Sequence, residues 1–251
     1  MLRLSLALAA AITLASSAET TPAQAPIAAT PGAHVKRVLF IGNSLTYAND
    51  LPLLVEAMTK DSEAPLRCES ATRADFSIED HWNAGVVKKV RAGGWAFVVL
   101  QQGPSSLDSS RENLREWTKR FGTEIRAAGA VPALYMVWPD RSRLEFLPRV
   151  IESYRLANAD VNGVLLPAGE VWRAAWSLRR DLELYGPDQF HPSRLGTFAA
   201  AAVIAARLSG VSPESLKSRY RLRNGDDYTV DEGGAAVVRS AVGDIIRSAT
   251  P

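Results

Sequence analysis

Short apolar runs alternate with amphipathic segments along most of the chain. Residues 38–41, 95–100 and 131–138 are almost wholly apolar, which is typical of strands buried on both faces of a sheet. Shorter strands are expected at 66–70 and 161–167. Helical spacing recurs between these runs, so the pattern predicts parallel strands joined by helices.

Several helix boundaries can be placed from local signals. Residues 77–80 resemble a capping box, and Asp50 before Pro52 is typical of a helix start with the acid as N-cap. No stretch has the pattern of a β-hairpin, and we find no internal repeat. We therefore predict an α/β fold, a three-layer α/β/α sandwich with a five-stranded parallel sheet. The expected helices are 51–60, 77–90, 111–128, 144–159, 169–180, a helix of small residues ending at 206, and 235–246.

The amino terminus has the pattern of a secretory signal. Arg3 precedes an apolar core at 4–15, and small residues allow cleavage after Ala18 or Ala25. The apolar core is shorter than a membrane span requires, and an uncleaved anchor is the alternative interpretation. We expect a signal peptide at 1–25, a linker at 26–34 and a single domain at 35–251, with 210–251 as a C-terminal extension packed on it. The predicted location is secreted or periplasmic, without stable membrane insertion after cleavage.

Composition excludes several classes of function. The chain has 251 residues, of which 47% are hydrophobic, enough for one domain with a substantial core. A formal net charge of +2 without a dense Lys/Arg cluster argues against a nucleic-acid partner. Cys68 is the only cysteine, so an intramolecular disulfide is impossible. With three histidines and no His-Glu-x-x-His or Cys-x-x-Cys motif, we expect neither a metal nor a cofactor.

The first strand ends in a sequence that can expose a serine. Gly42-Asn43-Ser44 follows the apolar run, a short distance before the helix expected from residue 51. A serine in such a turn lies at the carboxyl ends of the parallel strands, where ligands bind, with its N–H near the positive end of a helix. The polar loop at 101–106 follows another strand and should face the same crevice. An ordinary turn serine is the alternative interpretation.

A nucleophilic serine needs a general base, and the base needs an orienting acid. His34 lies in the linker, and His81 lies inside an expected helix, where a hydrogen-bonded or surface histidine is the usual case. His191 lies in a loop, three residues after Asp188. That spacing can set the carboxylate against one ring nitrogen and leave the other for Ser44. A turn-forming acid and a loop histidine are the alternatives.

Gly42-Asn43-Ser44-Leu45 and Asp188-x-x-His191 together resemble the first and last blocks of the SGNH/GDSL family of serine hydrolases. The resemblance covers most of residues 36–209. The serine comes first and the acid and histidine come together near the end, unlike the order in α/β-hydrolases. The resemblance implies a flavodoxin-like sandwich and ester hydrolysis through an acyl-serine intermediate. Ser44 would be the nucleophile, His191 the general base and then acid, and Asp188 the orienting carboxylate.

The middle blocks of the chain depart from the family pattern. The family implies three oxyanion donors: the Ser44 N–H, a glycine N–H in the second block and an asparagine side chain in the third. Here Asp75 is the best match to the glycine, and the strand ends in Gln101-Gln102 in place of the asparagine. This resembles a branch, including some carbohydrate esterases, in which glutamine takes that role. Gln101 is the first choice and Gln102 the second; a glutamine that only caps the strand is the alternative.

Three further residues have two interpretations each. Trp138 and Tyr185 could line a sugar or acyl pocket, although an aromatic residue at a strand end more often belongs to the core. Glu170 could support the site, but a charge at a helix N-terminus is the preferred interpretation.

The sequence thus predicts a secreted serine esterase for a small-molecule or carbohydrate ester, with a small acyl or O-acetyl group as the part removed. An acyltransferase of the same fold is one alternative. A catalytically silent SGNH-like domain that binds glycans is another. The acyl group, the alcohol, the substrate-binding residues and the oligomeric state are left open.

Overall fold

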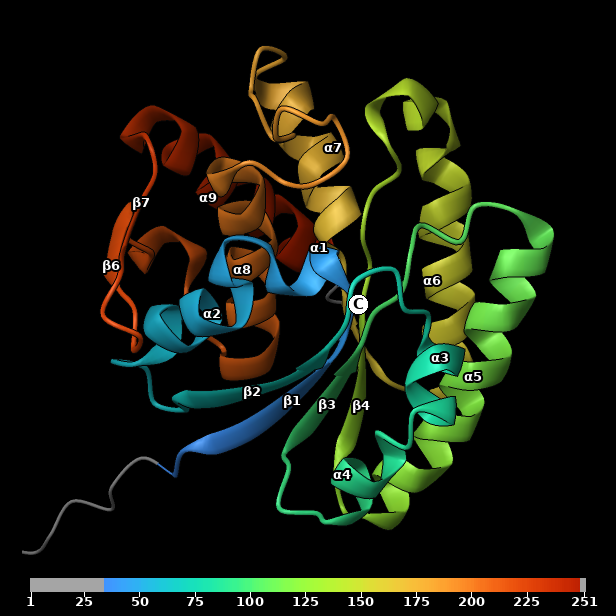
Figure 1. Ribbon diagram of the computed structural model, residues 1–251. Coiled ribbons are helices and arrows are strands. Elements are labelled where there is room, and N and C mark those ends of the chain that lie inside the picture. Colours follow the sequence, from blue (N-terminus) through green and yellow to red (C-terminus); the bar gives the residue numbers. More distant parts are fainter. Residues whose placement is uncertain (1–33, 249–251) are drawn as a thin grey trace, which may run out of the picture. The chain divides into compact units, whose positions relative to one another are not determined.

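The structure, a computed structural model, describes residues 34–248, so the predicted signal peptide and nearly all of the predicted linker lie outside the described residues. Within the described range, five parallel strands form one sheet in the order β2-β1-β3-β4-β5 (Figure 1). The strands are β1 Lys36–Gly42, β2 Leu66–Thr72, β3 Phe97–Leu100, β4 Val131–Tyr135 and β5 Val164–Leu166. The three-layer fold class predicted from the sequence is confirmed.

This strand order determines where a ligand can bind. The chain leaves β1 toward β2 on one side and later returns to place β3 on the other, so the direction of winding reverses between β1 and β3. Ligands of such sheets bind outside the carboxyl ends of the strands at this point. Gly42 ends β1 and Leu100 ends β3, and Ile41 pairs with Leu100 in the sheet. The segments that begin at Asn43 and Gln101 therefore leave the sheet side by side.

Helices cover both faces of the sheet (Figure 1). One layer contains α3, α4, α5 and α6, and the other contains α2, α7 and α8, with α9 packed against α7 and α8. The helices are α1 Ser44–Tyr47, α2 Leu51–Thr59, α3 Ile78–Asn83, α4 Val87–Arg91, α5 Asp108–Ala127, α6 Leu147–Val161, α7 Ala168–Leu178, α8 Arg194–Ser209 and α9 Glu232–Ser248. Short 3₁₀ turns are η1 Ala48–Asp50, η2 Arg141–Phe146 and η3 Pro213–Ser215.

The burial of the elements follows from their composition. Val38–Ile41 and Val98–Leu100 are fully buried because helices pack on both faces of the strands. Helix α8 is apolar on nearly all sides, and its alanines 199–202 are also fully buried. Small side chains let this helix fit between α2, α7 and α9. No helix within residues 34–248 is long and apolar enough to cross a membrane.

Three local expectations are corrected. The segment predicted as one helix at 77–90 is two helices, because Gly85 adopts a φ of +79° between α3 and α4. A β-hairpin is present, formed by β6 Arg219–Arg221 and β7 Asp227–Thr229. Each of its strands has three residues with one inward side chain, too short for an alternating pattern. Asp50 precedes α2 in the left-handed region, and its side chain makes no capping hydrogen bond.

Candidate active site

Ser44 is placed by a sharp turn between β1 and α1. Asn43 is extended, with φ −117° and ψ −153°, and Ser44 is the first helical residue. The Asn43 side chain caps this short helix, since its Oδ1 accepts a hydrogen bond from the Leu45 N–H at 3.1 Å. The capping fixes the direction in which the chain leaves the strand, so the Ser44 hydroxyl lies at the carboxyl end of the sheet.

Asp188 and His191 come to Ser44 from the loop between α7 and α8. The His191 Nε2 is 2.8 Å from Ser44 Oγ, and the His191 Nδ1 is 2.5 Å from Asp188 Oδ2. Asp188 Oδ1 also accepts hydrogen bonds from the N–H groups of Phe190, at 3.1 Å, and His191, at 2.9 Å. The carboxylate therefore folds the loop with one oxygen and orients the imidazole with the other.

The hydrogen-bond partners determine the tautomer of His191. The side-chain hydrogen bond from His191 lowers the pKa of Asp188, and the two backbone N–H groups add to this effect. Asp188 is therefore ionised at neutral pH and can only accept a hydrogen bond. The His191 Nδ1–H must donate to Asp188, which leaves Nε2 to accept from the Ser44 hydroxyl. This is the arrangement that a general base requires.

Aromatic residues support the Asp188–His191 loop through ring stacking and hydrogen bonds. Trp138 stacks on Trp172 with ring centroids 3.6 Å apart, and its Nε1–H donates to the Phe190 carbonyl at 3.1 Å. The Tyr185 hydroxyl donates to the Pro139 carbonyl at 2.7 Å. Trp138 is fully buried, so of its two interpretations the core position is the one observed. The loop is thus held in place although the side chains of Asp188 and His191 are partly exposed.

A residue next to the serine turn links the two ends of the site. Asn49 Nδ2 donates to the Pro192 carbonyl at 3.0 Å and to Thr197 Oγ1 at 2.9 Å. Its backbone is left-handed, with φ +51°, a conformation that asparagine tolerates better than most residues. Asn49 therefore ties the Ser44 segment to the end of the His191 loop.

Gln101 supports the serine turn from inside the protein. Its Oε1 accepts from the Asn43 N–H at 2.9 Å and from Thr46 Oγ1 at 2.7 Å. Its Nε2 donates to Asn43 Oδ1 at 3.0 Å and to the Gln102 carbonyl at 2.6 Å. Gln101 is fully buried, and both amide hydrogens have acceptors within the protein. The first choice for the oxyanion donor therefore has a different role in this structure: it holds the turn that carries Ser44.

The same network explains the glycine before Asn43. A Cβ on Gly42 would overlap both Gln101 Oε1 and Thr46 Oγ1. Gly42 is needed because of this close approach, and its φ lies outside the left-handed region. The turn formed by Gly42, Asn43 and Ser44 is thus packed closely against Gln101.

Gln102, the second choice, lines the cleft that contains Ser44. This cleft has a volume of about 400 Å³, and Ser44, Asp75 and Gln102 all contribute to its wall. The Gln102 Oε1 accepts from the Ile78 N–H at 3.2 Å, and its Nε2 donates one hydrogen bond, to Ser105 Oγ at 3.0 Å. The amide can donate a second one. The remaining lining residues are Asn43, Phe76, Ser77, Gly103, Pro104, Ser105, Ser110, Asn113 and Phe190.

Asp75 adopts a backbone conformation that glycine favours. Its φ is +62°, at the third position of a turn closed by the Phe76 N–H and the Arg73 carbonyl at 3.3 Å. Glycine adopts this region without steric cost. Within residues 34–248, the N–H groups of Asp75 and Ser44 have no hydrogen-bond acceptor. Both residues line the cleft, so these two backbone N–H groups stay candidate donors there.

The structure shows the surroundings of the remaining residues that the sequence singled out. His81 is buried, and its Nε2–H donates to the Gly42 carbonyl at 2.8 Å, so it is the hydrogen-bonded histidine that the sequence suggested. His34 is exposed. Glu170 lies in the first turn of α7, as preferred, and pairs with Arg155 at 2.8 Å. Cys68 is buried, which raises the pKa of its thiol. Among the residues that the structure describes, no group of three His, Cys, Asp or Glu side chains could hold a metal ion.

Sequence reasoning missed Asn43, Thr46 and Asn49 as supports of the site. In the sequence, Asn43 stands out only as part of the Gly-Asn-Ser motif, and no local pattern marks Asn49. The local signals are weak. An asparagine before a helix suggests an N-cap, which accounts for the hydrogen bond from Leu45 to Asn43. The other partner of Asn43 Oδ1 is Gln101, which is 58 positions away in the sequence. Contacts of this kind are set by strand order.

The fold was compared with known proteins. No protein-family model matches the chain, and no curated protein matches its sequence. Solved structures do match it. A candidate SGNH hydrolase from Slackia heliotrinireducens is 28% identical, with a TM-score of 0.58 over 69% of this chain and 99% of that protein. A DUF4886 family protein from Bacteroides uniformis has a TM-score of 0.67 at 16% identity, over 85% of this chain and 95% of that protein.

A lipase/acylhydrolase from Enterococcus faecalis matches with a TM-score of 0.55 at 17% identity, over 70% of this chain and 96% of that protein. At such low sequence identities, the similarity to these structures shows that the folds are alike. The chain has the fold of the SGNH/GDSL hydrolases, as the motif resemblance predicted. Its likeness to the carbohydrate-esterase branch remains a prediction.

Proposed function

We propose that the chain is a serine esterase that removes a short acyl group, such as O-acetyl, from a carbohydrate or another small ester. The observation that carries this proposal is the hydrogen-bonded series Ser44–His191–Asp188, with distances of 2.8 Å and 2.5 Å. A serine hydroxyl, a neutral imidazole and an ionised carboxylate in this order form the machinery for acyl transfer through the serine. The SGNH/GDSL fold adds support.

In the proposed mechanism, Ser44 Oγ attacks the ester carbonyl carbon while His191 Nε2 accepts the hydroxyl proton. The carbonyl oxygen becomes an oxyanion, and the imidazolium is stabilised by Asp188. Collapse of the tetrahedral intermediate breaks the bond to the alcohol, which leaves with the proton from His191. The acyl group then remains on Ser44.

The oxyanion would be held by donors that line the cleft. The Ser44 N–H and the Asp75 N–H have no acceptor within the described residues, and the Gln102 amide has one hydrogen to spare. The Ser44 N–H also lies at the first turn of α1, where backbone N–H groups point outward. Gln102 takes precedence over Gln101 in this proposal, because both amide hydrogens of Gln101 are already used.

Water completes the cycle. The side chains of His191 and Asp188 are 38% and 52% exposed, so water can reach the acyl-enzyme without a lid opening. His191 Nε2 takes a proton from this water, which attacks the acyl carbon. The second tetrahedral intermediate then releases the carboxylic acid, and the proton returns to Ser44. This exposure supports hydrolysis over transfer to another acceptor.

The cleft supports a small and polar substrate. Its volume of about 400 Å³ is near the lower end for small-molecule sites. Ser105, Ser110 and Asn113 contribute polar atoms to the wall, and Phe76 and Phe190 contribute apolar surface. Such a wall fits a short acyl group with a hydroxyl-bearing alcohol better than a long lipid chain. Because residues 1–25 have the pattern of a signal peptide, we place this activity outside the cytoplasm.

The experiment uses purified protein with 4-nitrophenyl acetate, butyrate and octanoate, followed by acetylated xylan and sugar acetates. We expect the acetate to be cleaved with the highest kcat/KM, and Ser44→Ala to abolish cleavage. A wild type as inert as Ser44→Ala on every ester would overturn the proposal. If octanoate were preferred over acetate, the esterase would stand, but its small-acyl preference would be wrong.

A further inference from the structure

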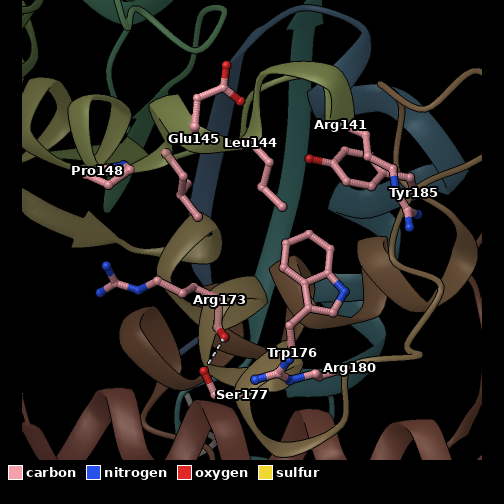
Figure 2. A pocket seen from close by; sticks show the side chains of 10 residues that line it. Arg141, Leu144, Glu145, Pro148, Arg173, Trp176, Ser177, Arg180 and Tyr185 are labelled. Atoms are coloured by element: carbon pink, nitrogen blue, oxygen red, sulfur yellow. Dashed lines mark hydrogen bonds between the residues drawn. The ribbon is translucent and has the colours of Figure 1, made fainter.

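A second and larger pocket lies away from Ser44, between helix α7 on one side and η2 with the start of α6 on the other (Figure 2). Its volume is about 620 Å³. Half of its ten lining residues are apolar or aromatic: Leu144, Leu147, Pro148, Trp176 and Tyr185. None of these residues lines the cleft that contains Ser44.

The aromatic part of this pocket offers a flat surface. Trp176 is partly exposed, and its ring lies nearly parallel to that of Tyr185, with centroids 5.8 Å apart and an angle of 29°. The Trp176 Nε1–H donates to the Leu182 carbonyl at 3.0 Å, and the Tyr185 hydroxyl donates to the Pro139 carbonyl. Tyr185 is buried, and the Trp176 N–H is already used inside the protein. Trp176 is therefore the ring that can offer a ligand an apolar surface.

Three arginines surround this surface. Arg141, Arg173 and Arg180 all line the pocket, and Figure 2 shows them on different sides of the Trp176 ring. Within residues 34–248, the side chains of Arg141 and Arg180 make no hydrogen bond or ion pair. Arg173 reaches only Glu170, at 3.8 Å, and that carboxylate is already paired with Arg155 at 2.8 Å.

The pocket therefore has an excess of positive charge. Glu145 is the only acidic residue in its wall, and in Figure 2 its carboxylate points away from Trp176. The neighbouring Asp140 uses its carboxylate to cap η2 through Ser142, at 2.8 Å from the backbone N–H. Guanidinium groups without partners beside an apolar wall are suited to bind an anion, because they present paired donors that match a carboxylate.

We infer that this pocket binds a carboxylate carried by a flat or ring-shaped body. The ring would pack on Trp176, and the carboxylate would accept hydrogen bonds from the arginines. Two sources share this chemistry: an acidic sugar, such as a uronic acid, and an aryl carboxylate.

The loop that carries the catalytic residues borders both sites. Tyr185 lines the pocket that Arg141, Arg173 and Arg180 surround. Phe190 lines the cleft that contains Ser44. The Arg141 N–H also donates to the Gln189 carbonyl at 2.9 Å. Binding at this pocket needs no step of the esterase mechanism, so a binding measurement alone can test it.

The test is isothermal titration calorimetry with four probes on the wild-type protein. Trigalacturonate and 2-naphthoate carry the carboxylate; α-1,4-linked galactotriose and 2-naphthamide are their neutral counterparts. We expect one-to-one binding of at least one carboxylate, with the neutral counterpart at least about tenfold weaker. The carboxylate that binds identifies the source as sugar or aryl.

The variant Arg141→Gln/Arg180→Gln should weaken that binding by about tenfold or more. Neither side chain has a partner in the described structure, so the melting temperature should stay near that of the wild type. The matched control, Lys88→Gln/Arg219→Gln, removes two exposed charges that do not line the pocket and should leave the affinity unchanged. Absence of binding by both carboxylates at millimolar concentration would overturn the inference. Equal binding of the neutral probes, or full affinity in the arginine variant, would overturn it as well.

Discussion

Ser44 is held from two sides that differ in almost every physical respect. On one side, Asn43, Thr46 and Gln101 are buried, and each polar atom of the Gln101 amide has a partner. On the other side, Asp188 and His191 lie on a loop, with side chains 52% and 38% exposed. The buried side fixes the position of Ser44, and in the proposed mechanism the exposed side moves its proton.

The difference has a simple cause. Buried amides must be fully hydrogen-bonded, because an unpaired polar group away from water costs about 1–3 kcal/mol. A catalytic imidazole must instead change its charge and exchange protons with substrate and water, which solvent access permits. Substitutions on the two sides should therefore have different signatures: loss of turnover on the exposed side, and loss of stability together with turnover on the buried side.

The largest expected effect is on the exposed side. His191→Asn removes the base, so kcat for 4-nitrophenyl acetate should fall by about 10⁴-fold or more. The free energy of unfolding, measured by urea denaturation, should change by less than about 1 kcal/mol because the ring is partly in solvent. The control His34→Asn, at an exposed position outside the site, should leave kcat unchanged. An active His191→Asn protein would exclude the triad.

The next largest effect is expected for Gln102, whose role in the cleft differs from that of Gln101. Gln102→Leu removes the amide that lines the cleft, and loss of an oxyanion donor lowers kcat by about 10²–10³-fold. KM should change much less, since the donor is used mainly in the transition state. Steady-state kinetics with 4-nitrophenyl acetate measure both constants. A Gln102→Leu enzyme with wild-type kcat would remove Gln102 from the oxyanion site.

On the buried side, Gln101→Leu leaves the Asn43 N–H and the Thr46 hydroxyl without their acceptor. We expect the free energy of unfolding to fall by about 2–4 kcal/mol, measured by urea denaturation. Turnover should fall as well, since the serine turn loses its support. If Gln101→Leu lowered kcat while its stability stayed that of the wild type, the contrast between the two sides would be wrong.

The smallest effect concerns the buried histidine behind the turn. Burial lowers the pKa of His81, so below the ordinary pKa of histidine the unfolded chain binds a proton that the folded protein does not. Stability therefore falls as the pH decreases through this range. His81→Gln removes this titration, so its loss of stability between pH 7.5 and pH 5.5, followed by urea denaturation, should be smaller than in the wild type. An equal loss in both proteins would contradict the assignment.

Much of the fold could be predicted because its signals are local. The buried strands 38–41 and 95–100 were recognisable as apolar runs, and the capping box at Ser77 is present, with Ser77 Oγ accepting from the Asp80 N–H at 3.2 Å. Strands with only one inward-facing side chain leave no alternating pattern in the sequence, so they cannot be predicted from it. The three-residue strands β6 and β7 were missed for this reason.

The sequence by itself determined the order of strands and helices and the candidates Ser44, Asp188 and His191. These rest on hydrophobic period, on short spacings and on the scarcity of histidine. Only the tertiary structure decided that Gln101 turns inward to the serine turn while Gln102 lines the cleft. Successive side chains at a strand end point in opposite directions, so a shift of one residue exchanges their surroundings. Which direction is inward depends on packing between β1 and β3, which no local pattern records.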